Sequence, residues 1–188
     1  MPPIPTLHTP RLILQGVTAA DIPAYERYFI DYAVIRNLSA AVPWPYPPDG
    51  VSEFLTSTVF PRQGIDRWMW GIFERETPHE LIGAIDLWRE ERPEQRGFWL
   101  GCPFWGRGYM TEAATSVNEY AFTSLGFKRL IFENARGNAR SRRVKEKTGA
   151  RLIQVCPAQF VDPALTEQEL WELTREAWER WRNGDHEK

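Results

Sequence analysis

The chain reads Trp105-Gly106-Arg107-Gly108-Tyr109-Met110-Thr111 between a predicted strand, residues 97–100, and a predicted helix, residues 111–125. Two glycines separated by one residue let the backbone turn tightly and approach a ligand closely, because neither carries a Cβ. The unpaired N–H groups and the dipole of the following helix turn favour an anion at the same place. Alone, this stretch indicates an anion site, and a glycine turn that only connects strand to helix explains it equally well.

Two familiar phosphate-binding patterns do not fit this stretch. A Walker-type loop needs Gly-Lys-Ser/Thr at the start of the helix, and that sequence is absent. A dinucleotide fingerprint needs a third glycine or alanine where Thr111 stands, and it belongs to an opening βαβ unit rather than to the middle of a chain.

Hydrophobic periodicity on either side of the stretch predicts a mixed α/β fold. Three strands with short polar connections form an antiparallel meander before it, and alternating strands and helices after it imply parallel crossovers packed on that meander. The predicted strands are 11–14, 68–73, 81–88, 97–100, 130–132 and 152–155, and the predicted helices are 18–29, 49–59, 111–125 and 139–148.

Three segments have a less regular pattern. Residues 1–10 are proline-rich and are expected to form an irregular lead-in, and residues 43–48 a stiff aromatic loop. Thr166 and Glu169 have the spacing of a capping box, which favours a helix in the last segment. A final strand over 170–174 with a helix after it is the alternative.

Composition narrows the class of protein. The 188 residues carry a formal net charge of −2 and two cysteines, which predicts one domain, residues 1–188, without a disulfide scaffold. No signal peptide or membrane span is recognisable, so we expect a cytoplasmic protein that binds no membrane. The acidic balance argues against nucleic acid, although four arginines cluster locally. They are Arg136, Arg140, Arg142 and Arg143.

Five ordered motifs run along the chain. They are Thr9-Pro10-Arg11-Leu12-Ile13-Leu14; Pro43-Trp44-Pro45-Tyr46; Leu81-Ile82-Gly83; Phe98-Trp99-Leu100 followed by residues 103–113; and Asn138-Ala139-Arg140-Ser141 followed by Val144, Glu146, Lys147, Gly149 and Ala150. Together they resemble the GNAT superfamily of N-acetyltransferases, and its RimJ/RimL-like branch in particular. The resemblance extends to about Val155. It implies the acyl-CoA N-acyltransferase fold, with a mostly antiparallel central sheet, flanking helices and a splayed strand pair that binds CoA.

The same resemblance implies which residues bind acetyl-CoA. Backbone N–H groups of the glycine stretch would hold the pyrophosphate, and the strand before it would bind the pantetheine arm as an added strand. An N–H near Trp99 or Leu100 could stabilise an oxyanion. The expected cofactor-binding residues are Phe98, Trp99, Leu100, Gly106, Arg107, Gly108, Tyr109, Met110, Thr111, Asn138 and Ser141. Met110 departs from the glycine or alanine that the family usually has.

Ser141 and Asp86 are the candidate catalytic residues. Many relatives have a tyrosine where this chain has Lys145, so the resemblance makes Ser141 the candidate to hydrogen-bond the CoA sulfur. A serine that only caps a helix is the alternative. Asp86 could act as base or as amine anchor, with Glu133 as a second possibility. For both carboxylates, a salt bridge or a solvent-facing strand position is the favoured interpretation.

The acceptor side is less defined. Trp44 and Tyr46 on the proline-rich loop, with Trp88, could line an apolar acceptor pocket, although we expect most tryptophans to be core residues and Trp44 to be the exception. No metal is expected, and Cys102 is interpreted as structural because the motif contains no histidine.

The sequence therefore predicts direct acetyl transfer from acetyl-CoA to a primary amine. The amine would belong to a protein N-terminus, a small molecule or an antibiotic, and a homodimer is left open. The rival is a non-catalytic acyl-CoA-binding module, because neither the usual tyrosine nor a clear base is present. A nucleic-acid-binding domain is a weaker rival.

Overall fold

The first sheet contains five strands in the order β1-β2-β3-β4-β5, and every neighbouring pair is antiparallel. This computed structural model describes residues 4–89 and 95–184. The strands are β1 (Leu7–His8), β2 (Leu12–Gly16), β3 (Arg67–Glu74), β4 (Thr77–Trp88) and β5 (Arg96–Leu100). The meander is confirmed. The irregular lead-in is wrong in part, because Leu7 and His8 pair with Leu14 and Ile13 at the edge of the sheet.

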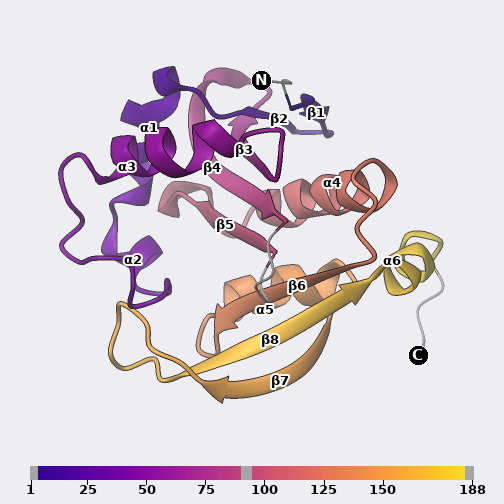
Figure 1. The fold of residues 1–188 in the computed structure, drawn as a ribbon. Helices are drawn as coiled ribbons and strands as arrows, with labels where there is room; N and C mark the ends of the chain where they lie inside the picture. The colour runs from indigo at the N-terminus through magenta and orange to yellow at the C-terminus, as the bar shows by residue number, and fades with distance from the viewer. Residues whose placement is uncertain (1–3, 90–94, 185–188) are drawn as a thin grey trace.

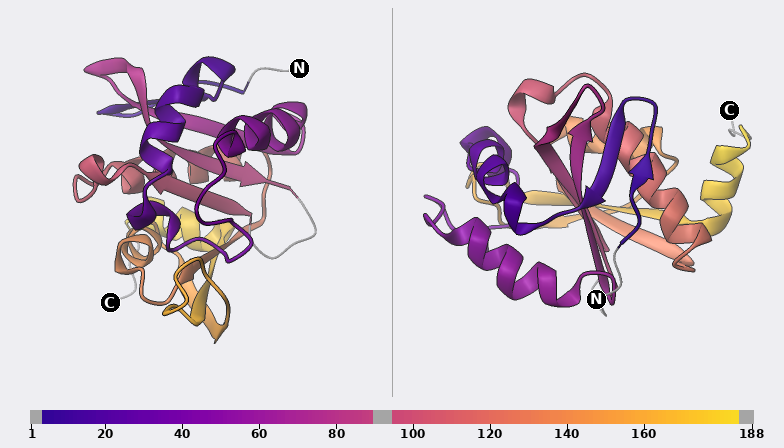
Figure 2. Two further views of the ribbon diagram at one scale, coloured as in Figure 1. Left: turned by 90° about the vertical axis from the view of Figure 1, so that its left-hand side faces the viewer. Right: turned by 90° about the horizontal axis from the view of Figure 1, so that it is seen from above.

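Successive side chains of a strand point to opposite faces of the sheet, so this sheet contributes to two separate apolar cores, one on each face. Met69 packs with the helices on one face, and Trp70 packs with α4 (Tyr109–Thr123) on the other. The two helical layers stand on opposite sides of the strands in Figure 2. The first layer contains α1 (Ile22–Phe29), α2 (Tyr32–Ile35) and α3 (Gly50–Phe54), which continues as a π-helix (Leu55–Val59) and a 3-10 turn (Phe60–Arg62).

The second sheet has the order β6-β8-β7 and lies below the first in Figure 1. Its strands are β6 (Arg129–Ala135), β7 (Arg151–Pro157) and β8 (Glu167–Thr174), accompanied by α5 (Ala139–Lys147) and α6 (Arg175–Arg182). The strands β6 and β7 both run antiparallel to β8, which lies between them. β6 and β7 therefore run parallel to each other and are joined through α5, as the predicted crossover requires, but they do not pair, because β8 lies between them.

The last segment corrects a second prediction. The helix that the capping-box spacing favoured at Thr166 is wrong, since residues 167–174 form the central strand of the second sheet. Carboxylates of this strand meet arginines of its neighbours, and Glu169 pairs with Arg142 and Glu172 with Arg151. The alternative, a strand followed by a helix, is confirmed by α6, whose N-cap is Thr174.

Hydrogen bonds between Gln95 and Ile131 join the two sheets on the β5 side. The backbone N–H of Gln95 donates to the carbonyl oxygen of Ile131 at 2.9 Å, and the Gln95 side chain accepts from the Ile131 N–H at 3.2 Å. Beyond that point β5 and β6 belong to different sheets. The splayed strand pair is thus confirmed, and it creates the space described next. None of the helices in 4–89 and 95–184 has the length and apolar run needed to span a bilayer.

Candidate active site

A cavity of about 700 Å³ lies where β5 and β6 diverge. Its wall is formed by β5, the connection from β5 to α4, the first turn of α4, the end of β6 and one face of α5. Residues 33–34 and 37–41, with 158–160, close the other end. Segments far apart in the sequence therefore share one cavity, which is large enough for a small organic ligand.

The glycine stretch forms one end of this cavity. Gly106 and Gly108 have φ angles of +78° and +81°, and Gly108 is the N-cap of the fifteen-residue helix α4. Only glycine adopts this left-handed region without strain, so the two residues permit the turn that directs the N-terminus of α4 at the cavity. The N–H groups in the first turn of a helix have no partner within the helix, so a turn of this kind can bind an anion.

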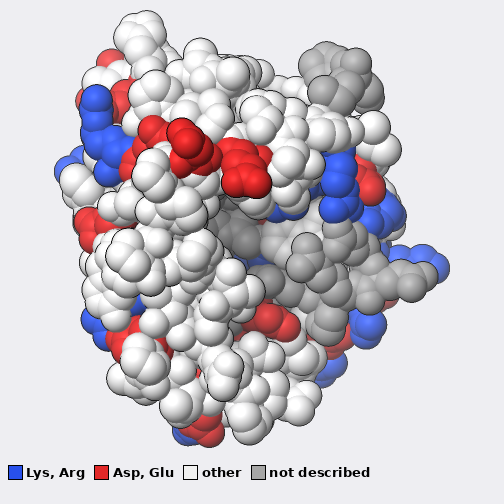
Figure 3. Space-filling view, turned by 60° about the vertical axis from the view of Figure 1, so that its left-hand side comes forward, with Lys and Arg blue, Asp and Glu red and all other residues white. Residues whose placement is uncertain are grey.

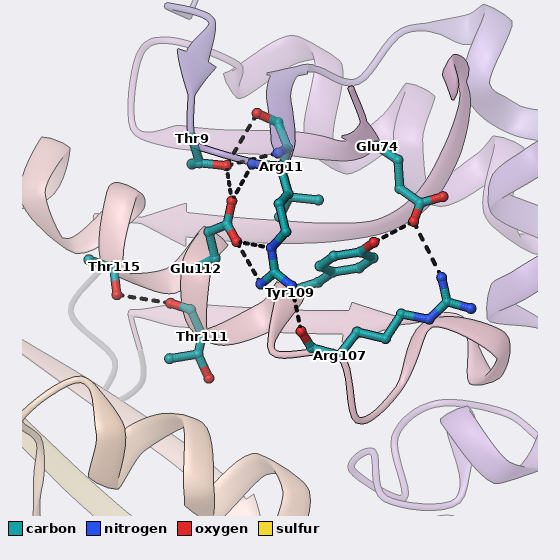
Figure 4. Close-up of polar contacts among 9 residues, drawn as sticks. Thr9, Arg11, Glu74, Arg107, Tyr109, Thr111, Glu112 and Thr115 are labelled. Atoms are coloured by element: carbon teal, nitrogen blue, oxygen red, sulfur yellow. Dashed lines mark hydrogen bonds and ion pairs between the residues drawn. The ribbon is translucent and has the colours of Figure 1, made fainter. Parts of the chain in front are cut away.

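A network of polar and charged side chains joins this turn to the β1–β2 connection, as Figure 4 shows. The Arg11 guanidinium donates to the carbonyl oxygen of Arg107 at 2.8 Å and pairs with the Glu112 carboxylate at 2.7 Å. Glu112 also accepts from the Thr9 hydroxyl and from the Arg11 backbone N–H, at 2.6 and 2.8 Å. Tyr109 donates to Glu74 at 2.6 Å. The β1–β2 connection thereby fixes both the loop and the first turn of α4.

Glu112 should make this network dependent on pH. Burial alone would raise the pKa of Glu112, but hydrogen bonds from Thr9 and Arg11 outweigh burial and lower it. Since the folded pKa lies below the ordinary value of about 4.5, the stabilisation is present at neutral pH and is lost as the pH falls through the folded pKa. We expect Glu112→Gln to reduce the free energy of unfolding by on the order of 1 kcal/mol at pH 7.

Urea denaturation at several pH values tests this expectation. The difference between wild type and Glu112→Gln should shrink as the pH falls through the folded pKa of Glu112, because wild-type Glu112 then also becomes neutral. The exposed residue Glu119 on the same helix supplies the control variant Glu119→Gln, which should show no such pH dependence. A difference that persists unchanged at pH 3 would contradict the role given to the carboxylate.

Trp105 connects the loop to the far wall of the cavity. Its indole Nε1 donates to the Leu100 carbonyl oxygen at 2.7 Å, and the Arg140 guanidinium lies 3.8 Å from its ring centroid. Gly101 donates its N–H to Ile82 of β4 at 2.9 Å. Neighbouring strand residues turn their backbone groups to opposite edges, so the N–H and C=O of Leu100 face away from β4 and toward the divergence from β6.

Ser141 and Lys145 of α5, with its N-cap residue Asn138, stand on the opposite wall. The Asn138 side chain caps the helix by accepting from the Ser141 N–H at 3.2 Å. The Ser141 hydroxyl accepts from Lys145 Nζ at 2.8 Å, and all three residues line the cavity. Lys145 is only 1% exposed and was missed as a functional residue, because a lysine on a helix usually belongs to a solvated face.

Ten of the eleven predicted cofactor-binding residues line this one cavity. They are Phe98, Trp99, Leu100, Gly106, Gly108, Tyr109, Met110, Thr111, Asn138 and Ser141. The exception is Arg107, whose side chain reaches Glu74 at 3.5 Å. The Met110 side chain is 7% exposed and packs in the apolar core.

Asp86 lies away from the cavity wall. It is 5% exposed on β4 and accepts hydrogen bonds from the Arg67 guanidinium on β3, itself 6% exposed. The Arg67 guanidinium also lies 5.5 Å from the ring of Trp88, a predicted acceptor residue. Asp86 thus occupies the salt bridge that was its favoured interpretation. Among the two candidate carboxylates, Glu133 lines the cavity and Asp86 does not.

The aromatic loop also lies outside the cavity wall. Trp44 is 43% exposed and packs against Tyr32 with ring centroids 5.2 Å apart, while Tyr46 packs against Phe29. Trp68, Trp70, Trp88 and Trp99 are all buried, which confirms that Trp44 is the exposed exception. The structure therefore does not bring Trp44, Tyr46 or Trp88 to the wall of the cavity.

Other segments form the end of the cavity opposite the glycine loop. The N–H of Ala40 donates to the Gln159 carbonyl oxygen at 3.0 Å, and the N–H of Val161 donates to that of Leu38 at 2.9 Å. An Arg36–Asp162 ion pair closes the same junction. The lining residues here are small or uncharged: Ala33, Val34, Asn37, Leu38, Ser39, Ala40, Ala41, Ala158, Gln159 and Phe160. Uncharged side chains also cover most of the molecular face in Figure 3.

Two kinds of chemistry find no support at this site. Burial, followed by the hydrogen bond to Asp31, raises the pKa of Cys102 to about 11, so its thiol is protonated at neutral pH and is a poor nucleophile. Within residues 4–89 and 95–184, no group of histidine, cysteine, aspartate and glutamate side chains could hold a metal ion.

Comparison with known proteins gives one consistent result. Residues 11–151 match the acetyltransferase (GNAT) domain family. A curated relative, the FsC-acetyl coenzyme A-N(2)-transacetylase of Aspergillus fumigatus, is 33% identical over 94% of this chain and 79% of its own length. An acetyltransferase from Agrobacterium tumefaciens is 25% identical, with a TM-score of 0.72 over 92% of this chain and 95% of that one. Mycobacterium smegmatis RimJ in complex with CoA-disulfide shares the fold at 17% identity, with a TM-score of 0.75 over 96% and 93% of the two chains.

Proposed function

This chain belongs to the acetyltransferase (GNAT) family, and from that premise we propose that it transfers an acetyl group directly from acetyl-CoA to a primary amine in the cavity between β5 and β6. Family membership makes it an acyl-CoA-dependent acetyltransferase. The observation that carries the proposal is the continuity of one cavity from the glycine loop to Ser141. Acetyl-CoA supplies the thioester, and the rest of the site binds, orients and polarises it.

The glycine loop suits the phosphates of acetyl-CoA. Gly106 and Gly108 direct backbone N–H groups at one end of the cavity, and Arg140, Arg143 and Lys147 of α5 line the same space. Backbone N–H groups and cationic side chains together form the usual surroundings of a bound pyrophosphate. Along the edge of β5, the Leu100 carbonyl oxygen already accepts from Trp105, so its N–H, which faces away from β4, is the proposed donor to the pantetheine arm or to an oxyanion.

The side chains at the acceptor end of the cavity are uncharged, and this suits an acceptor that carries no further positive charge. Among the described lining residues, Glu133 is the sole carboxylate of the whole cavity, and the segments around Leu38 and Gln159 carry no charged side chain on the wall. Polycationic aminoglycosides would lack counter-charges here. We therefore propose a peptide α-amine, as at a protein N-terminus, as the first acceptor to test, with an uncharged small amine as the second. The curated relative that is named as an FsC-acetyl coenzyme A-N(2)-transacetylase supports transfer to a nitrogen atom.

Glu133 is the proposed general base or amine anchor, because it stands on the cavity wall from β6. We expect Glu133→Gln to lower kcat by about 10²-fold or more, the usual contribution of a positioned acid or base, while KM for acetyl-CoA changes little. Steady-state kinetics at saturating acetyl-CoA check this, with the exposed residue Glu76 giving the control variant Glu76→Gln. An unchanged kcat would remove Glu133 from the mechanism.

Release of free thiol from acetyl-CoA tests the proposed function. The acceptor panel should contain peptides with free N-termini, uncharged small amines and aminoglycosides. Thiol release that depends on a peptide or small amine, with an N-acetylated product seen by mass spectrometry, is the expected result. Tight CoA binding without turnover on any acceptor would favour the acyl-CoA-binding module instead.

A further inference from the structure

Lys145 is a buried cation at the centre of the cavity wall. Its side chain is 1% exposed, and buried lysines are rare unless they are paired. Its Nζ lies 2.8 Å from the Ser141 hydroxyl oxygen, one helical turn earlier, and 5.3 Å from the ring centroid of Phe98 on β5. The ammonium group therefore lies between the two walls of the cleft, α5 and β5.

Hydrogen-bond chemistry fixes the direction of this contact. A lysine ammonium has three donors and no acceptor, so the Ser141 oxygen must accept from Lys145. The capping bond to Asn138 uses the Ser141 backbone N–H and leaves the hydroxyl group uninvolved. The hydroxyl proton of Ser141 is consequently directed away from Lys145, and Ser141 lies on the cavity wall.

We propose that Lys145 is the positioning residue for Ser141, and that its ammonium group and the Ser141 hydroxyl together form the site that stabilises the departing CoA thiolate. This inference rests on the proposed acetyl transfer. It assigns to a lysine–serine pair the place at which many relatives have a tyrosine. Ser141 meets the sulfur directly, and Lys145 acts through Ser141 and through its charge.

The transfer step balances without another reactant. The amine nitrogen forms a bond to the acetyl carbon while the bond from that carbon to sulfur breaks, and its electron pair stays on the sulfur. The Ser141 hydroxyl donates a hydrogen bond to this thiolate, and the Lys145 charge stabilises it. The amine nitrogen gives up one proton to the proposed base Glu133, which passes it to solvent, and the thiolate takes up one proton from solvent, so CoA leaves as the thiol.

Other charged groups also line the cavity and contribute to the potential at the sulfur. Besides Lys145, the titratable or charged side chains on the wall come from four elements: Arg96 on β5, Tyr109 on α4, Glu133 on β6, and Arg140, Arg143 and Lys147 on α5. A test of Lys145 must therefore compare variants of one position, so that these groups stay constant.

Ionisation of CoA bound to the protein gives a readout that needs no acceptor. The thiolate absorbs in the ultraviolet, so its absorbance can be titrated with pH in wild type, Lys145→Met and Lys145→Arg. We expect the bound thiol of wild type to ionise at least one pH unit below that of Lys145→Met, since one unit corresponds to a tenfold change in the thiolate fraction. Lys145→Arg, which keeps the charge, should recover most of the shift.

Kinetics should agree with this titration. Both Lys145→Met and Ser141→Ala should lower kcat by on the order of 10²-fold, as the loss of one oxyanion donor does, while KM for acetyl-CoA stays within about twofold. The double variant should lose less than the product of the two single losses, because Lys145 acts in part through Ser141. Lys128→Met, a change of an exposed lysine outside the cavity, is the matched control.

The outcomes separate this inference from the proposed function. Equal ionisation of bound CoA in wild type and Lys145→Met, or a double variant whose losses multiply, would overturn the role of Lys145 while leaving acetyl transfer intact. Failure of wild type to bind CoA would overturn both. If Lys145→Met is too unstable to study, Lys145→Gln keeps an N–H donor and removes the charge, and the same titration applies to it.

Discussion

Asp86→Ala is expected to destabilise the protein by about 3–5 kcal/mol, the usual cost of leaving one partner of a buried ion pair alone. Asp86 and Arg67 are 5% and 6% exposed and are hydrogen-bonded between β4 and β3. Removing the carboxylate leaves the guanidinium buried among Phe54 and Trp88. Calorimetry should show Tm lowered by roughly 10 °C for a protein of this size.

The paired variant gives the control for this expectation. Replacing both partners, as Arg67→Met with Asp86→Leu, should restore most of the lost stability, because no buried charge then lacks a partner. Acetyl transfer should follow the amount of folded protein in all these variants. A stable Asp86→Asn protein that binds acetyl-CoA but has lost turnover would contradict the structural role and return Asp86 to the mechanism.

Gly108→Val is expected to lower the affinity for acetyl-CoA by tenfold or more, a change of about 1.4 kcal/mol. Gly108 has a φ of +81°, where a β-branched residue is strained by roughly 1–2 kcal/mol. The new side chain would stand at the N-cap of α4, where the phosphates are proposed to bind, and a Cβ there would lie 3.5 Å from Arg11 Nη2. Calorimetric titration with acetyl-CoA measures the loss.

Gly126→Val separates the strain from the binding effect. Gly126 follows the other end of α4 with a φ of +69°, a Cβ added to it would meet no atom within 4 Å, and it does not line the cavity. Gly126→Val should therefore lose a similar amount of stability as Gly108→Val and keep the wild-type affinity for acetyl-CoA. Equal affinities for the two variants would contradict the placement of the phosphates at Gly108.

Local patterns predicted the parts of the fold that depend on neighbouring residues. The meander and α4 have clear periodicity. Asn138 was predictable as a helix cap, because its capping bond involves only the first turn of α5. Local spacing could not decide between a helix and the strand β8, because β8 is stabilised by residues distant in sequence. Its carboxylates at Glu169 and Glu172 pair with arginines of α5 and β7, and tertiary context of this kind overrides local propensity.

The same distinction applies to the site. The glycine loop and Ser141 were predictable because motifs carry them along the chain. The partners of Asp86 and Lys145 depend on which side chains meet across the fold. Asp86 resembles a candidate base until Arg67 is seen beside it, and Lys145 resembles a solvated helix residue until its burial against Ser141 and Phe98 is known.

Backbone amide NMR during titration with acetyl-CoA tests the central claim most directly. If acetyl-CoA binds between β5 and β6, the largest shifts should occur at Gly106, Gly108, Leu100 and Ser141, which line one cavity. The amides around Asp86 and Trp44, which lie away from its wall, should shift little. Saturable shifts confined to another surface, or none at millimolar acetyl-CoA, would contradict the account.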